Sequence, residues 1–138
     1  MKLVRESINE EDSGFKYLKP KPKEYIMKSI SHLSLEERFD KAIENGCDWL
    51  VKDCIEAGIN PAARDNYAIR RASYYGRTEC VKVLLADNRV NPAAGDNAAI
   101  RCAAYNGHTE CVKLLLTDNR VRNTLSKEDL IKYKNLIK

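Results

Sequence analysis

The sequence lacks long hydrophobic runs. No apolar stretch approaches the roughly 18 to 20 residues that a membrane-spanning helix requires. Residues 1–30 also lack the continuous apolar segment of a secretory signal. The five cysteines are an odd number without clustered spacing, which is typical of reduced thiols in a reducing compartment. We therefore expect a protein that is neither exported nor membrane-bound and that resides in the cytoplasm.

Residues with a recognisable chemical task are also scarce. There are two histidines, the carboxylates are scattered rather than paired, and no glycine-rich phosphate loop is present. Cys102, His108 and Cys111 lie close in sequence, and Cys80 lies earlier, so a zinc site is the first idea. Cys80 and Cys111, however, are 31 residues apart at the same position of an internal repeat, which predicts that they lie on two neighbouring stacked helices. Such positions lie roughly 10 Å apart, whereas sulfurs that share one zinc ion each lie about 2.3 Å from it. We expect no catalytic residue, no metal and no cofactor.

What the sequence does contain is an internal repeat. The segment AIRRASYYGRTECVKVLL at residues 68–85 recurs 31 positions later as AIRCAAYNGHTECVKLLL at residues 99–116. In each copy the apolar residues are spaced by three and four, which predicts two short helices, each with one buried stripe. The predicted buried residues are Ala68, Ile69, Ala72, Cys80, Val81, Leu84 and Leu85 in one copy, and Ala99, Ile100, Ala103, Cys111, Val112, Leu115 and Leu116 in the next.

Glycine and capping residues indicate where these helices begin and end. Gly76 and Gly107 stand between the two helices of each copy, where a helix end requires a left-handed backbone conformation. Side chains that accept hydrogen bonds from backbone amides precede each helix. The expected caps are Thr78 and Thr109 for the second helices, and Asp65, Asn66, Asp96 and Asn97 for the first.

Helices of roughly 8 to 10 residues are too short to persist alone in water. They become stable when they stack on similar units, which is the principle of a solenoid. A degenerate earlier copy spans residues 37–65, where Gly46 aligns with Gly76 and Phe39 aligns with Ile69. The sequence therefore predicts three units, at residues 34–64, 65–95 and 96–125.

These units resemble the ankyrin repeats, whose usual length is about 33 residues. The resemblance covers residues 34–121 and implies an all-α fold, a short helix-turn-helix solenoid with N- and C-terminal capping helices. The 31-residue period implies a shortened hairpin finger. Arg70 and Arg101 stand where the family has histidine, and we expect them to bond carbonyl groups of adjacent loops. The residues that match the family pattern are Ile100, Ala103, Ala104, Gly107, His108, Val112, Leu115 and Leu116, with His108 at a structural position.

Both ends of the solenoid need a cover. Ser34 and Glu37 have the spacing of a capping box that opens the first unit. Residues 126–138 are predicted to form a polar-faced capping helix that begins at Ser126. Residues 1–30 contain LKPKPKEY, whose prolines predict an extended arm. This arm is either loosely attached or a docking segment, with Phe15, Tyr17, Leu18 and Tyr25 as its contact residues.

The resemblance also implies a binding face. Partners of ankyrin repeats usually contact the concave face, which is built from the hairpin tips and the two positions before each joint glycine. Tyrosine and arginine are frequent in binding hot spots. A competing interpretation is that Tyr74 and Tyr105 pack against one another as a ladder. The candidate partner-binding residues are Tyr67, Tyr74, Tyr75, Tyr105, Asn106, Arg64, Glu44 and Asn45.

We interpret the chain as a non-enzymatic protein–protein interaction module, a scaffold or adaptor with a protein partner. One alternative is a structural subunit of a larger assembly, docked on a neighbour or on another copy through residues 1–30. The chain looks similar to short proteins of large viruses and phages as well as of cellular organisms, so its source is open. If the source is viral, the assembly is that of a virus and the cytoplasm that of its host. The last alternative is nucleic-acid contact through a C-terminal segment with a net charge of about +4. We favour the interpretation that these basic residues simply form a solvent-exposed helix face. The residues are Arg120, Arg122, Lys127, Lys132, Lys134 and Lys138.

Overall fold

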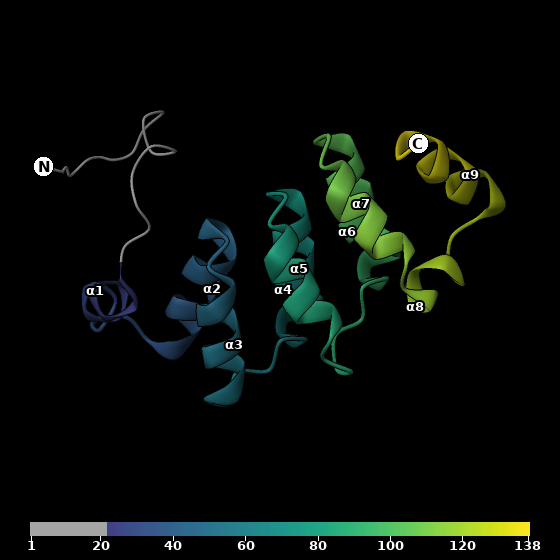
Figure 1. Ribbon diagram of the computed structural model, residues 1–138. Coiled ribbons are helices and arrows are strands. Elements are labelled where there is room, and N and C mark those ends of the chain that lie inside the picture. The colour runs from purple at the N-terminus through teal and green to yellow at the C-terminus, as the bar shows by residue number, and fades with distance from the viewer. Residues whose placement is uncertain (1–21) are drawn as a thin grey trace, which may run out of the picture. The chain divides into compact units, whose positions relative to one another are not determined.

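A computed structural model of the protein describes residues 22–138, which belong to two compact units, Met1–His32 and Leu33–Lys138. In the first unit the helix α1 (Lys23–Ser29) follows Pro22 directly (Figure 1). The expected extended path is therefore wrong for residues 23–29, because a proline at the start of a helix lacks only an N–H that the helix does not use. Residues 1–21, with Phe15, Tyr17 and Leu18, lie outside the described residues.

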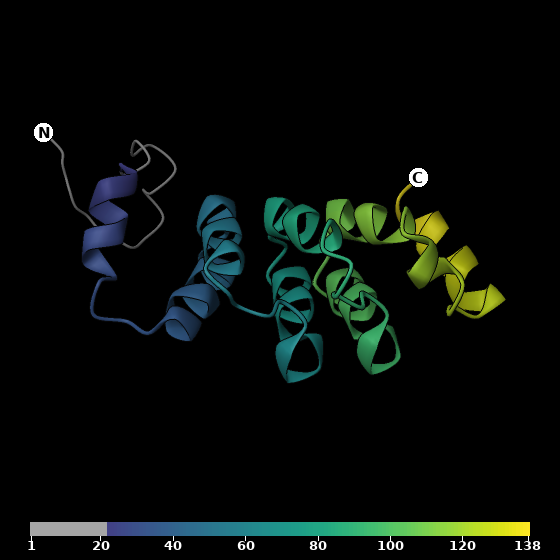
Figure 2. The same ribbon diagram turned by 90° about the horizontal axis from the view of Figure 1, so that it is seen from below.

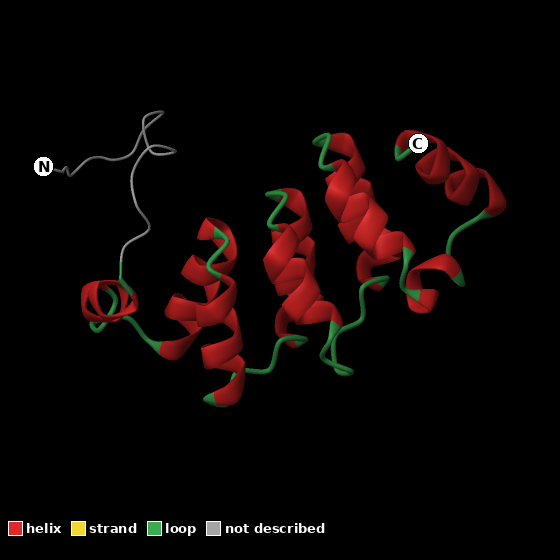
Figure 3. Ribbon diagram, in the orientation of Figure 1, coloured by secondary structure: helices red, strands yellow, loops and turns green. Residues whose placement is uncertain are grey.

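The second unit is a row of helical hairpins. Figure 2 shows the hairpins as two layers, the first-helix layer (α2, α4, α6) and the second-helix layer (α3, α5, α7). The described residues contain no strand, so the shortened finger is not a β-hairpin (Figure 3). The helices are α2 (Leu35–Asn45), α3 (Asp48–Glu56), α4 (Ala63–Tyr74), α5 (Thr78–Leu85), α6 (Ala94–Tyr105), α7 (Thr109–Leu116), α8 (Asn119–Arg122) and α9 (Lys127–Leu136).

The core between the layers consists of the predicted stripes. Phe39, Ile69 and Ile100 occupy one position in three successive first helices, and each is at most 4% exposed. Full burial of an aliphatic side chain contributes about 1.5 to 3 kcal/mol, so the stripes hold the hairpins together. Among the predicted stripe residues Leu85 is the exception, because it is only half-buried.

The joint glycines have the expected left-handed conformation, with φ of 71° at Gly46 and Gly76 and 74° at Gly107. The residue after the glycine bonds back to the preceding repeat. Arg77 Nε donates to the carbonyl oxygen of Glu44 at 2.8 Å, and His108 Nε2 lies 3.0 Å from the carbonyl oxygen of Tyr74. The structural role expected for His108 is confirmed.

The caps expected for the second helices are wrong. Thr78 and Thr109 are the first residues of α5 and α7, and the residues before them, Arg77 and His108, make no side-chain cap. The carbonyl oxygen of Arg77 already accepts a helical hydrogen bond from the amide of Val81. Thr78 therefore lies inside the helix, beyond the position from which a hydroxyl caps the first amides. Its hydroxyl instead lies 3.6 Å from Cys111 Sγ.

Each of α4 and α6 begins with a left-handed turn of three residues. The φ angles are 54° to 58° at residues 64–66 and 58° to 66° at residues 95–97. Such a backbone costs about 1 to 2 kcal/mol for each residue with a Cβ atom. Arg70 donates to the carbonyl oxygens of Asp65 (3.1 Å) and Arg64 (3.2 Å), and Arg101 bonds the equivalent turn in the same way. The expectation for both arginines is confirmed.

The Asp-Asn pairs within these turns do not cap the first helices, contrary to expectation. Asn66 Oδ1 accepts a hydrogen bond from the amide of Asn91 at 2.7 Å, in the loop before the next repeat. Asn97 Nδ2 donates to Thr124 Oγ1 at 3.0 Å, in the loop before α9. The left-handed backbone points these side chains along the stack. They therefore connect their own repeat to the segment that follows it, instead of capping their own helix.

The ends of the second unit follow the predicted capping signals. Ser34 and Glu37 form the reciprocal capping box, and Ser126 Oγ accepts from the amide of Asp129 at 3.1 Å. Helix α9 packs against α7 and buries Tyr133, which is 2% exposed. The prediction of a polar outer face is wrong for part of this helix, because Ile131 remains 60% exposed and Leu136 remains 44% exposed.

Candidate functional site

The predicted binding residues all lie on or beside the first-helix layer. Glu44 and Asn45 end α2, the residues from Arg64 to Tyr75 belong to α4 and its end, and Tyr105 and Asn106 end α6. Asn45 and Asn106 make the same hydrogen bond, from Nδ2 to the carbonyl oxygen four residues earlier, each at 2.9 Å. Their side chains therefore stabilise helix ends while both residues remain exposed, and their role in partner binding stays a prediction.

Arg64 is also held by its own fold. Its Nη2 lies 2.5 Å from Asp40 Oδ1, and its guanidinium carbon lies 4.4 Å from the centre of the Tyr67 ring. The hydrogen bond to Asp40 raises the pKa of Arg64, so its guanidinium stays charged. This ion pair connects α2 to α4 and orients Tyr67, which is half-buried.

Sequence reasoning missed Arg71, which organises the tyrosines of α4. Its guanidinium carbon lies 4.8 to 5.6 Å from the ring centres of Tyr67, Tyr74 and Tyr75. Its Nη2 donates to the hydroxyl of Tyr75 at 2.6 Å. Cation–π contacts of this kind contribute about 0.5 to 2 kcal/mol. The spacing of three and four residues between Arg71 and these tyrosines is the signal that could have found it.

Two tyrosines of this layer remain accessible. Tyr74 is 44% exposed and meets the edge of Tyr75, with ring centres 5.2 Å apart and an interplanar angle of 87°. Tyr105 is 91% exposed. A ring that is so open to solvent does not pack against the preceding repeat, so the interpretation of Tyr74 and Tyr105 as a ladder is wrong. The layer instead presents two rings on adjacent repeats.

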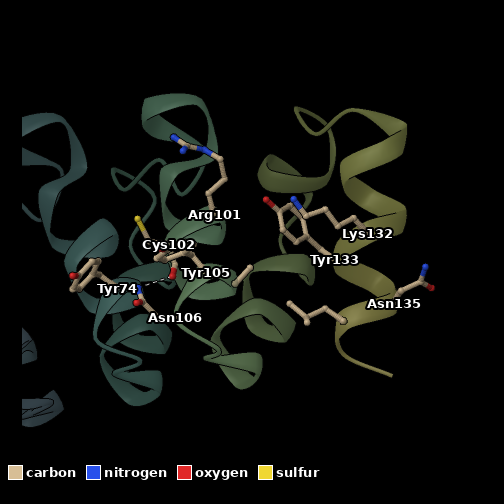
Figure 4. Close-up of a pocket in the computed structure, with 10 residues that line it drawn as sticks. Tyr74, Arg101, Cys102, Tyr105, Asn106, Lys132, Tyr133 and Asn135 are labelled. Carbon is tan, nitrogen blue, oxygen red and sulfur yellow. Dashed lines mark hydrogen bonds between the residues drawn. The ribbon is translucent and has the colours of Figure 1, made fainter.

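A groove lies beside these rings, between α6 and α9. This C-terminal groove has a volume of about 910 Å³ and a mostly apolar lining. Figure 4 shows Tyr133 and Lys132 extending from α9 toward α6, while Asn135 points away. The lining contains two cationic side chains and no carboxylate. Its principal lining residues are Tyr74, Arg101, Tyr105, Lys132, Tyr133 and Leu136.

The thiols and histidine of this unit serve the packing. All five cysteines are thiols rather than disulfides. Burial raises the pKa of the Cys80 thiol to about 12, and burial also raises the pKa of Cys54 and of Cys111. These thiols therefore stay protonated and unreactive at neutral pH. Within residues 22–138, no group of three His, Cys, Asp or Glu side chains is placed to hold a metal ion.

Two of the basic residues proposed for nucleic-acid contact are engaged in the fold. Arg120 donates to the carbonyl oxygens of Val90 (2.6 Å) and Leu85 (3.3 Å) and forms an ion pair with Asp118. Arg122 donates to the carbonyl oxygen of Leu116 at 2.7 Å. Both arginines therefore tie α8 to neighbouring loops and helices, and their charges are not displayed as a row.

A further property of the described helices concerns membranes. Across residues 22–138, none of the helices combines the length and the apolar character that crossing a bilayer requires.

Comparison with known proteins identifies a family. A family model of ankyrin repeats, in three copies, matches residues 39–126. Neither a curated protein nor a solved structure matches the chain. The matched range begins at Phe39 within α2 and ends at Ser126, so it covers most of α2 and all of the helices from α3 to α8.

Proposed function

The chain belongs to the ankyrin-repeat family, whose repeats generally act as protein–protein interaction modules, and from this premise we propose that it binds a protein partner through its first-helix layer. The partner would contact the concave face that α2, α4 and α6 form. Tyr74 and Tyr105 are the central contacts of this proposal. The observation that carries it is the exposure of these two rings on adjacent repeats, at 44% and 91%.

The rigid support of the rings favours this role. Tyr74 is held by the edge of Tyr75 and by Arg71, and its backbone carbonyl oxygen is bonded to His108 of the next repeat. A large amphipathic ring that is already ordered loses little conformational entropy when a partner covers it. Tyr67, Tyr75 and Arg64 belong to the support in this proposal, and the exposed rings make the contact.

The proposed role is binding without catalysis. The buried thiols have raised pKa values and stay protonated, and His108 Nε2 is hydrogen-bonded to the carbonyl oxygen of Tyr74. In this proposal the thiols therefore do not act as nucleophiles, and His108 does not act as a base. The reduced state of all five cysteines supports a location in a reducing compartment such as the cytoplasm.

The test is affinity capture with the full chain, compared between the unmodified protein and the double variant Tyr74→Ala/Tyr105→Ala. Tyr105 is 91% exposed, whereas Tyr74→Ala removes the contacts with Tyr75 and Arg71. The thermal midpoint should therefore fall only by the roughly 4 to 8 °C that a loss of about 1 kcal/mol causes, and the variant stays folded. We expect mass spectrometry to identify at least one protein that the double variant loses, because truncation of a hot-spot tyrosine costs about 1 to 2 kcal/mol, or roughly tenfold in affinity.

Tyr25→Ala is the control, because Tyr25 is an exposed tyrosine of α1, outside the first-helix layer. Recovery of the same proteins by the double variant would contradict the proposal. Loss of the same proteins in the Tyr25 variant alone would instead favour docking through the N-terminal arm.

A further inference from the structure

We propose that the C-terminal groove binds an acidic peptide segment of the partner, with an apolar side chain of that segment inserted between α6 and α9. This inference rests on the proposed function and specifies the chemistry of the partner. It also adds α9 to the binding surface, beyond the three repeats that the family model matches.

The shape of the groove follows from how α9 packs. Helix α9 contacts the second-helix layer through α7, and Tyr133 of α9 is only 2% exposed. The side of α9 that carries Leu136 is left beside the exposed ring of Tyr105. The resulting space of about 910 Å³ is in the range of pockets that enclose a ligand, and its lining is mostly apolar. An inserted aliphatic or aromatic side chain would be removed from water on several sides.

The charge of the groove selects the sign of its occupant. Arg101 and Lys132 line it, and no carboxylate does. Among the described residues, neither cation forms an ion pair, and Lys132 Nζ instead lies 5.3 Å from the centre of the Tyr133 ring. The Arg101 guanidinium points away from α9 (Figure 4) and is bonded to the carbonyl oxygens of Asp96 and Gly95. Arg101 also lines a smaller pocket together with the carboxylates Asp96 and Asp129, so Lys132 is the cation that the groove offers to an occupant. An acidic side chain next to the apolar anchor would compensate the charge of Lys132.

Two other occupants fit less well. A nucleic-acid strand is held by a row of cations along its phosphates, whereas only two cations line this groove, and Arg120 and Arg122 are bonded elsewhere. A second copy in a symmetric dimer would bring its own Lys132 against that of the first copy. Like charges would then meet in a desolvated interface.

Selection of a displayed library of random twelve-residue peptides on the immobilised full-length protein tests the proposal. We expect the enriched peptides to combine Asp or Glu with an aliphatic or aromatic residue. Their affinity should fall about tenfold or more with Lys132→Glu and with Leu136→Ala. The matched controls are Lys134→Glu and Ile131→Ala, which change exposed residues of the same helix that do not line the groove, and these should alter the affinity less than about twofold.

Several results would overturn the proposal. These are the absence of enrichment, enrichment of basic peptides, or an equal effect of the groove variants and their controls. Salt-sensitive binding of a twelve-residue oligothymidylate that Lys132→Glu abolishes would assign the groove to nucleic acid. Self-association in sedimentation that Leu136→Ala abolishes would assign it to a second copy. A captured partner that needs Tyr74 and Tyr105 but tolerates both groove variants would refute the groove while leaving the proposed function intact.

Discussion

Single residues after the joint glycines connect one repeat to the next. His108 lies against Gly76 of the preceding repeat, and a Cβ atom added at Gly76 would come within 2.5 Å of the His108 ring. No heavy atom lies within 4 Å of the corresponding position at Gly107. The two glycines have nearly the same φ, 71° and 74°. Comparing the same substitution at both positions therefore separates the cost of the backbone conformation from the cost of crowding.

We predict that Gly76→Ala destabilises the protein more than Gly107→Ala. Both variants place a Cβ atom in the left-handed region, at a cost of about 1 to 2 kcal/mol. The Gly76 variant also displaces the His108 ring from the carbonyl oxygen of Tyr74, which adds about 1 to 3 kcal/mol. Urea unfolding measures both values. Removal of the ring in Gly76→Ala/His108→Ala should reduce the extra loss that is due to crowding, and equal losses in the two single variants would contradict this account.

The Cys80 thiol makes stability depend on alkaline pH. Its pKa is raised from 9.0 to about 12 in the folded protein, chiefly because burial disfavours the thiolate. A raised folded-state pKa means that the full contribution is present below pH 9, where both states hold the proton. The contribution falls between about pH 9 and 12, where only the unfolded chain ionises.

We therefore predict that the unmodified protein loses stability faster than Cys80→Ala as the pH rises above 9. The difference in slope should approach, at most, about 1.4 kcal/mol per pH unit. Urea unfolding at intervals from pH 8 to 10.5 measures both slopes, and the other titrating groups are common to the two proteins. Parallel curves would show that Cys80 ionises equally in both states.

At the scale of the element, the left-handed turns that open α4 and α6 replace the hairpin finger. Each turn places three consecutive residues at positive φ, and only Gly95 among the six lacks a Cβ atom. Arg70 and Arg101 stabilise the turns by bonding their carbonyl oxygens. The turn places the Asn66 side chain within hydrogen-bonding distance of the loop before the next repeat. One local conformation therefore both starts a helix and connects two neighbouring repeats.

Asn66→Ala is predicted to lower the free energy of unfolding by about 2 to 4 kcal/mol. The substitution leaves the amide of Asn91 without its acceptor and puts alanine at a φ of 58°. Asn88→Ala is the control, because Asn88 is exposed in the same connection and should change stability by less than about 0.5 kcal/mol. Chemical denaturation of both variants decides the matter, and similar losses would show that the Asn66 connection is not important.

The elements show which features could be predicted from the sequence. Apolar spacing and the joint glycines predicted the helix pairs, because burial and the left-handed conformation of glycine follow mainly from residue type and local spacing. The turns at residues 64–66 were missed, because three non-glycine residues are unfavourable there until Arg70 bonds them. Thr78 was misplaced as a cap, because the helix begins one residue earlier than its hydroxyl suggests. Helix α1 was missed, because the prolines precede it rather than interrupt it.

At the scale of the whole second unit, the stack determines which side chains meet. Tyr74 and Tyr105 were predicted as binding residues from their place before the joint glycines, and the structure leaves both accessible. The contribution of α9 to the groove was not predicted, because it depends on how Tyr133 packs against the last repeat. Such long-range packing leaves no signature in the repeat itself.

The central claim, that a partner covers the first-helix layer at Tyr74 and Tyr105, is tested most directly by thiol footprinting. Cys102 is half-buried and lines the same surface as Tyr74 and Tyr105, while Cys47 is half-buried at the start of α3. The rates of iodoacetamide alkylation at both thiols are measured by mass spectrometry, with and without a saturating captured partner. We expect the rate at Cys102 to fall about tenfold or more while the rate at Cys47 is unchanged. An unchanged rate at Cys102, or protection of Cys47 alone, would contradict the claim.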